Sequence, residues 1–287
     1  MLCNLIYNRA EAEPNKNYIG FYRQACASRG VDFLLLYKED LDAGIIPMPE
    51  RGFVINRTRD LALTKQMEQM GLPVFNNSLI TYLGNDKLAA LRYIEEAGLP
   101  ILKTSENLED FDCFPVVMKS IDGHGGIEVF LLQRPEDAML RQTEAIAIRK
   151  AAISSNTPIR WIYQEPADTP GKDLRVYVTG SRITACMLRS SATDFRSNFC
   201  LGGKASVYTL SPEEEQTVQT IISHLSKTEN GLPEYRKAIG HCGIDFLFHQ
   251  GHLVFNELED VVGSRMLYTY TDIDVVDEYI GYILSVL

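Results

Sequence analysis

Residues 115–132 read PVVMKSIDGHGGIEVFLL, two apolar runs typical of strands on either side of a glycine-rich turn. Gly123, Gly125 and Gly126 lie in this turn, where backbone amides with no Cβ in the way can approach a phosphate and the hairpin can move as a lid. The segment is neither a Walker A loop nor a dinucleotide fingerprint, because neither spacing occurs and a strand follows the glycines. An ordinary tight hairpin is the alternative, since glycine is common in turns.

Two lysines accompany this hairpin. Lys119 ends the otherwise apolar run PVVMK, and a lysine at the end of a buried strand needs an anion or a carboxylate as its partner. Lys87 opens a helix predicted over residues 86–98, which ends at Gly98. Lys87 is therefore a second candidate cation, with a solvated helix residue as the alternative.

Three acidic residues occur in two apolar runs near the end of the chain. Asp245 lies inside GIDFLF, and Glu257 and Glu259 lie inside LVFNELE. A hairpin around Gln250-Gly251 brings Asp245 opposite the two glutamates, which share one face of their strand. Carboxylates gathered in an apolar setting repel one another, and Mg²⁺ with its preference for oxygen ligands relieves that repulsion. A rim of solvated acids is the alternative.

Arginines lie between these elements, in strands or loops. They are Arg175, Arg189 and Arg196, and the last begins the sequence Arg-x-Asn that ends at Asn198. Guanidinium groups suit phosphate or carboxylate because they can bind either in a bidentate manner. A surface ion pair is the alternative for any one of them.

Strand-like and helix-like segments alternate over the first 80 residues, which is typical of parallel β–α–β units. Later segments favour antiparallel hairpins, such as residues 173–179 and 182–189 around Gly180-Ser181. We therefore expect an α/β protein with α+β lobes, divided near residues 85 and 166. The expected domains are residues 1–85, an N-terminal α/β lobe, residues 86–166, a central part with the glycine-rich lid, and residues 167–287, a C-terminal part with the metal site.

Composition excludes several classes of protein. Lysine and arginine number 28 and aspartate and glutamate 38, which gives a net charge of −10 and argues against non-specific nucleic-acid binding. The first residues have early acids and no apolar core, unlike a signal peptide, and the longest apolar run near the end is far shorter than a membrane span of about 20 residues. We expect a cytoplasmic protein with neither a nucleic acid nor a membrane as partner.

Taken in order, these segments resemble the ATP-grasp superfamily, and within it the RimK-like carboxylate–amine ligases. The resemblance rests on seven pieces from Asp86 onward: Asp86-Lys87, residues 115–132, YQEP (163–166), GKDLRVYVTG (171–180), DFRSNFCLGG (194–203), GIDFLF (243–248) and FNELE (255–259). It implies an ATP-grasp fold, in which two antiparallel lobes clamp ATP beneath the lid. It also implies a ligase that joins a carboxylate to an amine through an acyl phosphate and releases ADP and phosphate.

The resemblance also implies roles for particular residues. Lys87, Lys119 and the lid glycines would contact the phosphates of ATP, Gln164 and Glu165 would lie at the adenine, and Asp173 near the ribose. Arg175, Arg189 and Arg196 would act in catalysis at the γ-phosphate and the acyl phosphate. Asp245, Glu257 and Glu259 would hold two Mg²⁺ ions, replaceable by Mn²⁺, with Asn198 nearby.

The sequence departs from the family at two places. Glu-x-Asn is usual at the metal site, where this chain has Glu257-Leu258-Glu259, and Val262 replaces a proline before Gly263. Arg57 and Arg59 follow a strand end, where ligands bind in parallel sheets, and are candidates for reading an acceptor carboxylate or a peptide, with a surface helix start as the alternative. An amino acid, a peptide or a protein tail stays open as the amine acceptor, as do the carboxylate donor and a homo-oligomer. A small-molecule kinase and a non-catalytic nucleotide-binding regulator are the alternative functions.

Overall fold

The computed structural model describes residues 1–153, 158–197, 203–227 and 239–287. Its N-terminal lobe is a parallel sheet in the order β2-β1-β3-β4, with helices in the connections. The strands are β1 (Leu2–Tyr7), β2 (Asp32–Tyr37), β3 (Phe53–Asn56) and β4 (Val74–Phe75), and the helices are α1 (Arg9–Ala12), α2 (Lys16–Ser28), α3 (Lys38–Asp42) and α4 (Leu61–Gln69). Because the strands are parallel, their carboxyl ends meet at one edge of the sheet.

A second sheet, in the order β5-β8-β6-β7, is antiparallel and carries the glycine-rich turn between β6 and β7. Its strands are β5 (Thr104–Ser105), β6 (Val116–Ser120), β7 (Val129–Leu132) and β8 (Trp161–Gln164), and a short 3₁₀ helix, Leu108–Asp110, follows β5. Helix α7 (Asp137–Ile153) packs on this sheet, where Ala138 joins a core with Met118 and Tyr163.

The third sheet, also antiparallel, has the order β11-β10-β9-β12-β13. Its strands are β9 (Lys172–Thr179), β10 (Arg182–Ser190), β11 (Lys204–Val207), β12 (His241–His249) and β13 (His252–Glu259). Alternation along β9 sends Leu174 and Val176 to an apolar face and Asp173 and Arg175 to the opposite face. The polar face of this sheet carries the candidate site.

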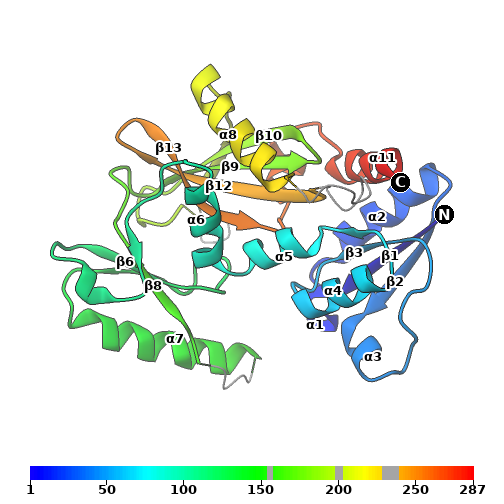
Figure 1. Ribbon diagram of the computed structural model, residues 1–287, viewed down its shortest axis with the longest axis horizontal. Helices are drawn as coiled ribbons and strands as arrows, with labels where there is room; N and C mark the ends of the chain where they lie inside the picture. The colour runs from blue at the N-terminus through cyan, green and yellow to red at the C-terminus, as the bar shows by residue number, and fades with distance from the viewer. Residues whose placement is uncertain (154–157, 198–202, 228–238) are drawn as a thin grey trace.

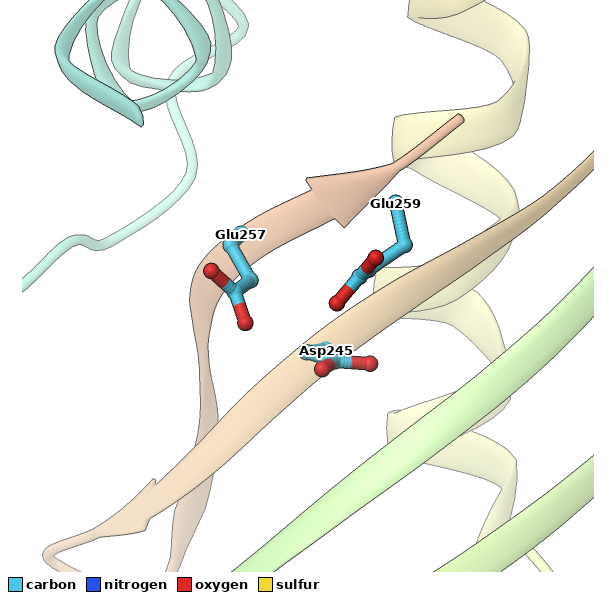
Figure 2. A group of neighbouring side chains, drawn as sticks. All are labelled: Asp245, Glu257 and Glu259. Atoms are coloured by element: carbon cyan, nitrogen blue, oxygen red, sulfur yellow. The ribbon is translucent and has the colours of Figure 1, made fainter. Parts of the chain in front are cut away.

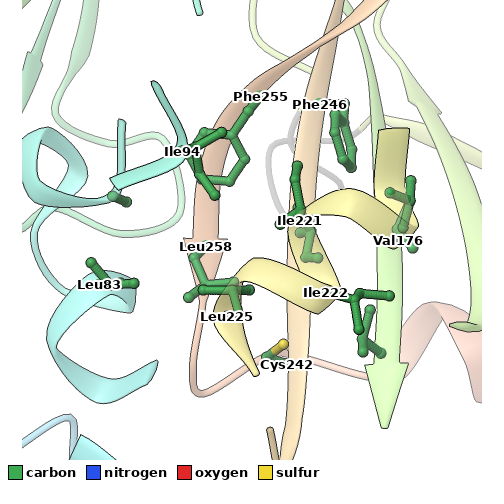
Figure 3. Packing of buried hydrophobic residues seen from close by; sticks show 14 of the residues in the cluster. Leu83, Ile94, Val176, Ile221, Ile222, Leu225, Cys242, Phe246, Phe255 and Leu258 are labelled. Atoms are coloured by element: carbon green, nitrogen blue, oxygen red, sulfur yellow. The ribbon is translucent and has the colours of Figure 1, made fainter. Parts of the chain in front are cut away.

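Helices from two parts of the chain cover the apolar face of the third sheet. They are α5 (Ser78–Gly84), α6 (Lys87–Glu96) and α8 (Pro212–Leu225). Figure 3 shows Ile94 of α6 beside Phe255 and Leu83 of α5 nearer Leu258, and Ile221 of α8 belongs to the same core. Asp86 caps α6 by accepting a hydrogen bond from the amide of Ala89 (2.9 Å), so the position of Lys87 is determined by both a cap and a packed helix.

The last helices pack on the N-terminal lobe. They are α10 (Arg265–Tyr270) and α11 (Val275–Val286). Tyr279 and Ile283 of α11 share one buried core with Ile19 and Tyr22 of α2, and Figure 1 shows the two helices side by side. The N-terminal lobe is thus completed by residues from the far end of the chain.

The expected fold class is confirmed, with one parallel sheet and two antiparallel sheets. Residues 101–104 read ILKT, a run that favours an extended strand, but β5 contains only Thr104 and Ser105. Ile101 instead forms an isolated bridge with Phe255 because its side chain packs into the core on the third sheet. No helix in the described part of the chain is long and apolar enough to cross a membrane.

Candidate functional site

A cavity of about 290 Å³ lies between the second and third sheets. Val117, Val129 and Leu131 line it from the second sheet, and Leu247 lines it from the third. The end of β8 and the residue after it also line the cavity: Gln164 is buried, and the amide of Glu165 donates to the carbonyl of Lys103 (2.9 Å). The cavity therefore has apolar walls from two lobes and a polar end.

Lys119 brings a positive charge to that polar end. Its Nζ donates to Oε1 of Gln164 and Oδ1 of Asn256, both at 2.9 Å, and the residue is 4% exposed. Burial, together with the charge of Lys87, lowers the pKa of Lys119 to about 8 despite the attraction of Glu257. Since a buried ammonium paired only with neutral amides is costly, this group favours an anion in the cavity.

Lys87 and the glycine-rich turn lie at the same end. Nζ of Lys87 donates to the carbonyl of Gly123 and lies 3.3 Å from Oε2 of Glu257. A Cβ on Gly123 would fall 2.0 Å from Oγ of Ser120, and Gly125 has a φ of 69°, so the path of the turn requires glycine at both positions. The turn can therefore approach a bound phosphate closely.

A helix on the second sheet holds this turn. Arg149 of α7 donates to Asp122 (2.8 and 3.1 Å) and to Glu128 (2.8 Å from Nε to Oε1), on the two sides of the glycines. His124 at the tip has its pKa lowered to about 3 by burial and by the charges of Arg59, Lys87 and Arg149, so it is neutral. Arg149 thus holds both sides of the turn, and the charges of Lys87 and Arg59 also act on its tip.

The three expected metal-binding carboxylates come together. Asp245 pairs with Glu257 across β12 and β13, as alternation predicted. One oxygen from each of Asp245, Glu257 and Glu259 lies within 4.8 Å of the other two, and Figure 2 shows the three side chains on one side of the hairpin. Sequence reasoning alone thus located this cluster.

Two arginines hold Asp245. Arg175 donates from Nε and Nη2 to the two oxygens of Asp245 (2.7 and 2.6 Å) and from Nη2 to Oε1 of Glu259 (3.0 Å). Arg189 donates to both oxygens of Asp173 (2.7 and 2.5 Å) and to Asp245 (2.7 Å). Burial opposes ionisation of Asp245, but the two guanidinium charges outweigh it and lower the pKa of this carboxyl. Burial raises the pKa of Glu259.

Formal charges in this region cancel. The acids are Asp173, Asp245, Glu257 and Glu259, and the cations are Lys87, Lys119, Arg175 and Arg189. Both oxygens of Asp245 already accept hydrogen bonds, whereas among the described residues Glu257 forms a single ion pair, the 3.3 Å contact with Lys87. An oxygen-only donor set fits Mg²⁺, with Glu257 the most open ligand.

The expected residues divide between the cavity wall and the layer behind it. The residues on the wall are Lys87, Lys119, Gly123, Gly125, Gly126, Gln164, Glu165, Asp173, Arg196 and Glu257. Arg196 reaches from the third sheet to the turn, where Nη1 donates to the carbonyl of Gly126 (2.8 Å). Arg175, Arg189, Asp245 and Glu259 lie behind the wall, and Asn198 lies outside the described residues.

Asn256 is a wall residue that sequence reasoning missed. Strict alternation would point Asn256 and Glu257 to opposite faces. The pairing shifts between Asp245–Glu257 and Phe246–Phe255, which leaves Asn256 as the extra residue of a β-bulge. A bulge re-aims a side chain, and here both Asn256 and Glu257 line the cavity. An asparagine inside the apolar run LVFNEL is the one signal that could have found it.

Comparison with known proteins bears on this site. A family model described as the RimK-like ATP-grasp domain matches residues 100–283. A protein of Marinomonas sp. (strain MWYL1) named probable alpha-L-glutamate ligase is 28% identical over 255 residues, which cover 83% of this chain and 77% of that protein. An uncharacterised protein of Mycoplasma pneumoniae, the MG011 homolog, is 22% identical over 266 residues, which cover 92% of this chain and 85% of that protein.

Solved structures agree on the fold. The crystal structure of the D-cycloserine synthetase DcsG matches with a TM-score of 0.74 and 13% identity over 100% of both chains. A RimK domain ATP-grasp protein from Sphaerobacter thermophilus DSM 20745 matches with a TM-score of 0.67 and 18% identity, over 99% of this chain and 100% of the other. At these identities the structures establish the ATP-grasp fold.

Proposed function

The chain belongs to the RimK-like ATP-grasp family of ATP-dependent carboxylate–amine ligases, and we propose that it forms its C–N bond through an acyl phosphate. A substrate carboxylate oxygen attacks the γ-phosphorus of ATP, and the bond to the β–γ bridging oxygen breaks to release ADP. The amine nitrogen then attacks the acyl carbon, loses a proton and expels phosphate. These steps need positioning and charge neutralisation more than acid–base catalysis.

The buried charge of Lys119 is the observation that carries the nucleotide assignment. It lies 2.9 Å from two neutral amides at the polar end of a cavity with apolar walls, which suits a phosphate beyond an adenine. Lys87, Arg196 and the amides of the glycine-rich turn would contact the phosphates on the other sides. Gln164 and Glu165 would border the adenine, and Asp173 would lie near the ribose.

Mg²⁺ would bind at Asp245, Glu257 and Glu259, and we propose two ions, as is usual for phosphoryl transfer from ATP. When bound, the metal would neutralise charge on the transferred phosphoryl group. Arg175 and Arg189 contact carboxylates rather than the cavity, so their proposed role is to orient Asp245 and Glu259. Of the three expected arginines, Arg196 lines the cavity and is our candidate for acting on a phosphoryl group.

The substrates are a carboxylate and an amine, and relatives named probable alpha-L-glutamate ligase make L-glutamate the first amine to test. Phosphorus NMR of the protein with Mg²⁺-ATP, pooled amino acids, short peptides and hydroxylamine tests the reaction directly. We expect ADP, free phosphate and a hydroxamate. ADP together with a phosphorylated small molecule would identify a kinase and contradict the acyl-phosphate route.

Glu257→Gln tests the metal assignment in the same assay. This change removes one negative charge but keeps the shape of the side chain, so we expect loss of Mg²⁺-dependent ADP release from a folded protein. Glu95→Gln is the matched control, because Glu95 is exposed on α6. Equal activity of the two variants would refute the proposed role of Glu257.

A further inference from the structure

Arg57 is a buried cation that forms no ion pair with an acid among the described residues. It follows β3 at the carboxyl edge of the parallel sheet and is 7% exposed. Its guanidinium lies 5.0 Å from the ring centroid of Tyr18 and 5.7 Å from that of Tyr7, and Nη2 donates to the carbonyl of Val262 (3.3 Å). Within the described ranges, no carboxylate lies within 4.0 Å of it.

The groups around Arg57 are neutral. Burial lowers the pKa of His241 to about 3, with a further contribution from Arg57, and burial raises the pKa of Tyr22 and Tyr279. The hydroxyls of Tyr7 and Tyr22 and Nε of Arg57 are buried and form no hydrogen bond with the described residues. Cation–π contacts with the tyrosines recover only part of the free energy that burying an unpaired ion costs.

Arg57 lies next to the carboxylate cluster. Val262, whose carbonyl accepts from Arg57, extends its side chain over Gly243: a Cβ on Gly243 would lie 2.8 Å from Cγ2 of Val262 and 3.5 Å from Cδ of Arg175. Arg175 in turn holds Asp245. Val262 and Arg175 thus border the same glycine, so Val262 and Gly243 lie between Arg57 and the side chains of the carboxylate cluster.

Arg59, in the same loop after β3, also has features typical of a functional site. Arg59 has a φ of 59°, a left-handed conformation that residues with a Cβ seldom adopt and that tends to occur at functional sites. Its Nη1 lies 3.0 Å from Glu11, and its charge contributes to the lowered pKa of His124 in the glycine-rich turn. The loop after β3 thus lies close to both the turn and the strand-end segment that contains Val262.

We propose that Arg57 is the specificity-determining residue that binds the free carboxylate of an amino-acid substrate, the carboxylate that this substrate keeps when its amine reacts. The inference rests on the proposed ligase reaction. A bound carboxylate supplies the counter-charge that Arg57 lacks, and a guanidinium can bind it in a bidentate manner. Tyr18 lies half-buried over the guanidinium, and Gly263, the neighbour of Val262, is exposed.

Thermal unfolding of Arg57→Met without ligands separates a binding role from a structural one. Methionine keeps the apolar stem and removes the unpaired charge, so we expect a melting temperature equal to or above that of the wild type. Arg51→Met, at an exposed position two residues before β3, is the control. A melting temperature several degrees below that of Arg51→Met would show that Arg57 supports the fold, and would overturn the proposal.

Ligand-induced stabilisation tests recognition itself. With Mg²⁺-ADP present, each of the twenty amino acids is added separately, L-glutamate first. Each amino acid that binds is then compared with the derivative in which its carboxylate is replaced by an amide. The wild type and Arg51→Met should be stabilised by an acid but not by its amide, and Arg57→Met by neither. A wild type that responds to no amino acid, or an Arg57→Met protein that responds equally, would overturn the subsite.

Turnover distinguishes this inference from the ligase proposal. Hydroxylamine is an amine without a carboxylate, so its reaction should not depend on Arg57. Arg57→Met should therefore lower the ratio of amino-acid-dependent to hydroxylamine-dependent ADP release. We expect a fall of at least about 30-fold, within the range for a charge-assisted contact. A parallel fall in both rates would assign Arg57 to the carboxylate donor and overturn the amine assignment. A wild type without hydroxamate would refute the ligase reaction, whatever the binding results.

Discussion

Replacing Lys119 with methionine should stabilise the ligand-free protein while weakening its affinity for ATP. The pKa of Lys119 falls from an ordinary 10.5 to about 8, because burial disfavours the charged form. A shift of roughly 2.5 units corresponds to about 3 kcal/mol of lost stability at pH 7. Gln164 and Asn256 would each lose a donor in the variant, at about 1 kcal/mol apiece, which leaves a net gain of about 1 kcal/mol.

The dependence on pH is the sharper part of this prediction. Between pH 8 and 10.5 the unfolded chain keeps the Lys119 proton and the folded protein releases it, so the stability of the wild type rises with pH through this window. The increment approaches 1.4 kcal/mol per pH unit and should be absent from Lys119→Met. Urea unfolding in EDTA at pH 7, 8 and 9 measures it.

Calorimetry completes the test. Loss of one charge-assisted contact should weaken ATP binding by about 1–3 kcal/mol, and the wild type should take up a proton on binding ATP above pH 8. Lys65→Met, on the exposed side of α4, is the control for losing a lysine. Parallel stability–pH curves for Lys119→Met and the wild type would refute the reasoning, because the buried charge would then carry no penalty.

Two further changes test the layer behind the cavity and the glycine-rich turn. Arg175→Met leaves Asp245 and Glu259 without their shared cation and should lower the free energy of unfolding by about 3–5 kcal/mol in urea with EDTA; a loss below about 1 kcal/mol would contradict the role of the pair. Arg149→Met frees Asp122 on the glycine-rich turn, so we expect a raised KM for ATP in steady-state kinetics, and an unchanged KM would show that the turn needs no such anchor.

Local sequence predicted much of the fold. The apolar run of residues 2–7 became β1, and the hairpin around Gln250-Gly251 brought Asp245 opposite Glu257. Caps also follow from local sequence, since Ser211 and Glu214, three positions apart, form a capping box at the start of α8. These features succeed because each depends on neighbours only a few residues apart.

Pairings between distant segments could not be predicted in the same way. Asp245 lies beside Arg175 because β12 pairs with β9 in one register, and seventy positions separate the two residues. Sequence reasoning therefore expected Arg175 at a phosphate, whereas its guanidinium contacts carboxylates. The bulge at Asn256 was not predicted for a related reason, since alternation cannot reveal where a strand holds an extra residue.

The boundary expected near residue 85 stays a prediction. It divides the chain by position in the sequence, which does not reveal which sheet the next helix packs on. Lys87–Glu96 were expected to belong with the second sheet, yet Leu91 and Ile94 pack with Phe255 on the third sheet. Helix α6 therefore carries Lys87 on the body that bears the carboxylates, while the glycine-rich turn belongs to the other sheet. A hinge motion of the second sheet would break the contact between Lys87 and Gly123.

The packing of α11 on α2 has a consequence for synthesis of the protein. A ribosome makes residues 19–22 long before Tyr279, Ile280 and Ile283, which pack in the same core. Until those residues emerge, Ile19 and Tyr22 lack much of their apolar cover, and the nascent lobe exposes an apolar face. We therefore expect the nascent lobe to bind chaperones until residue 283 has left the ribosome.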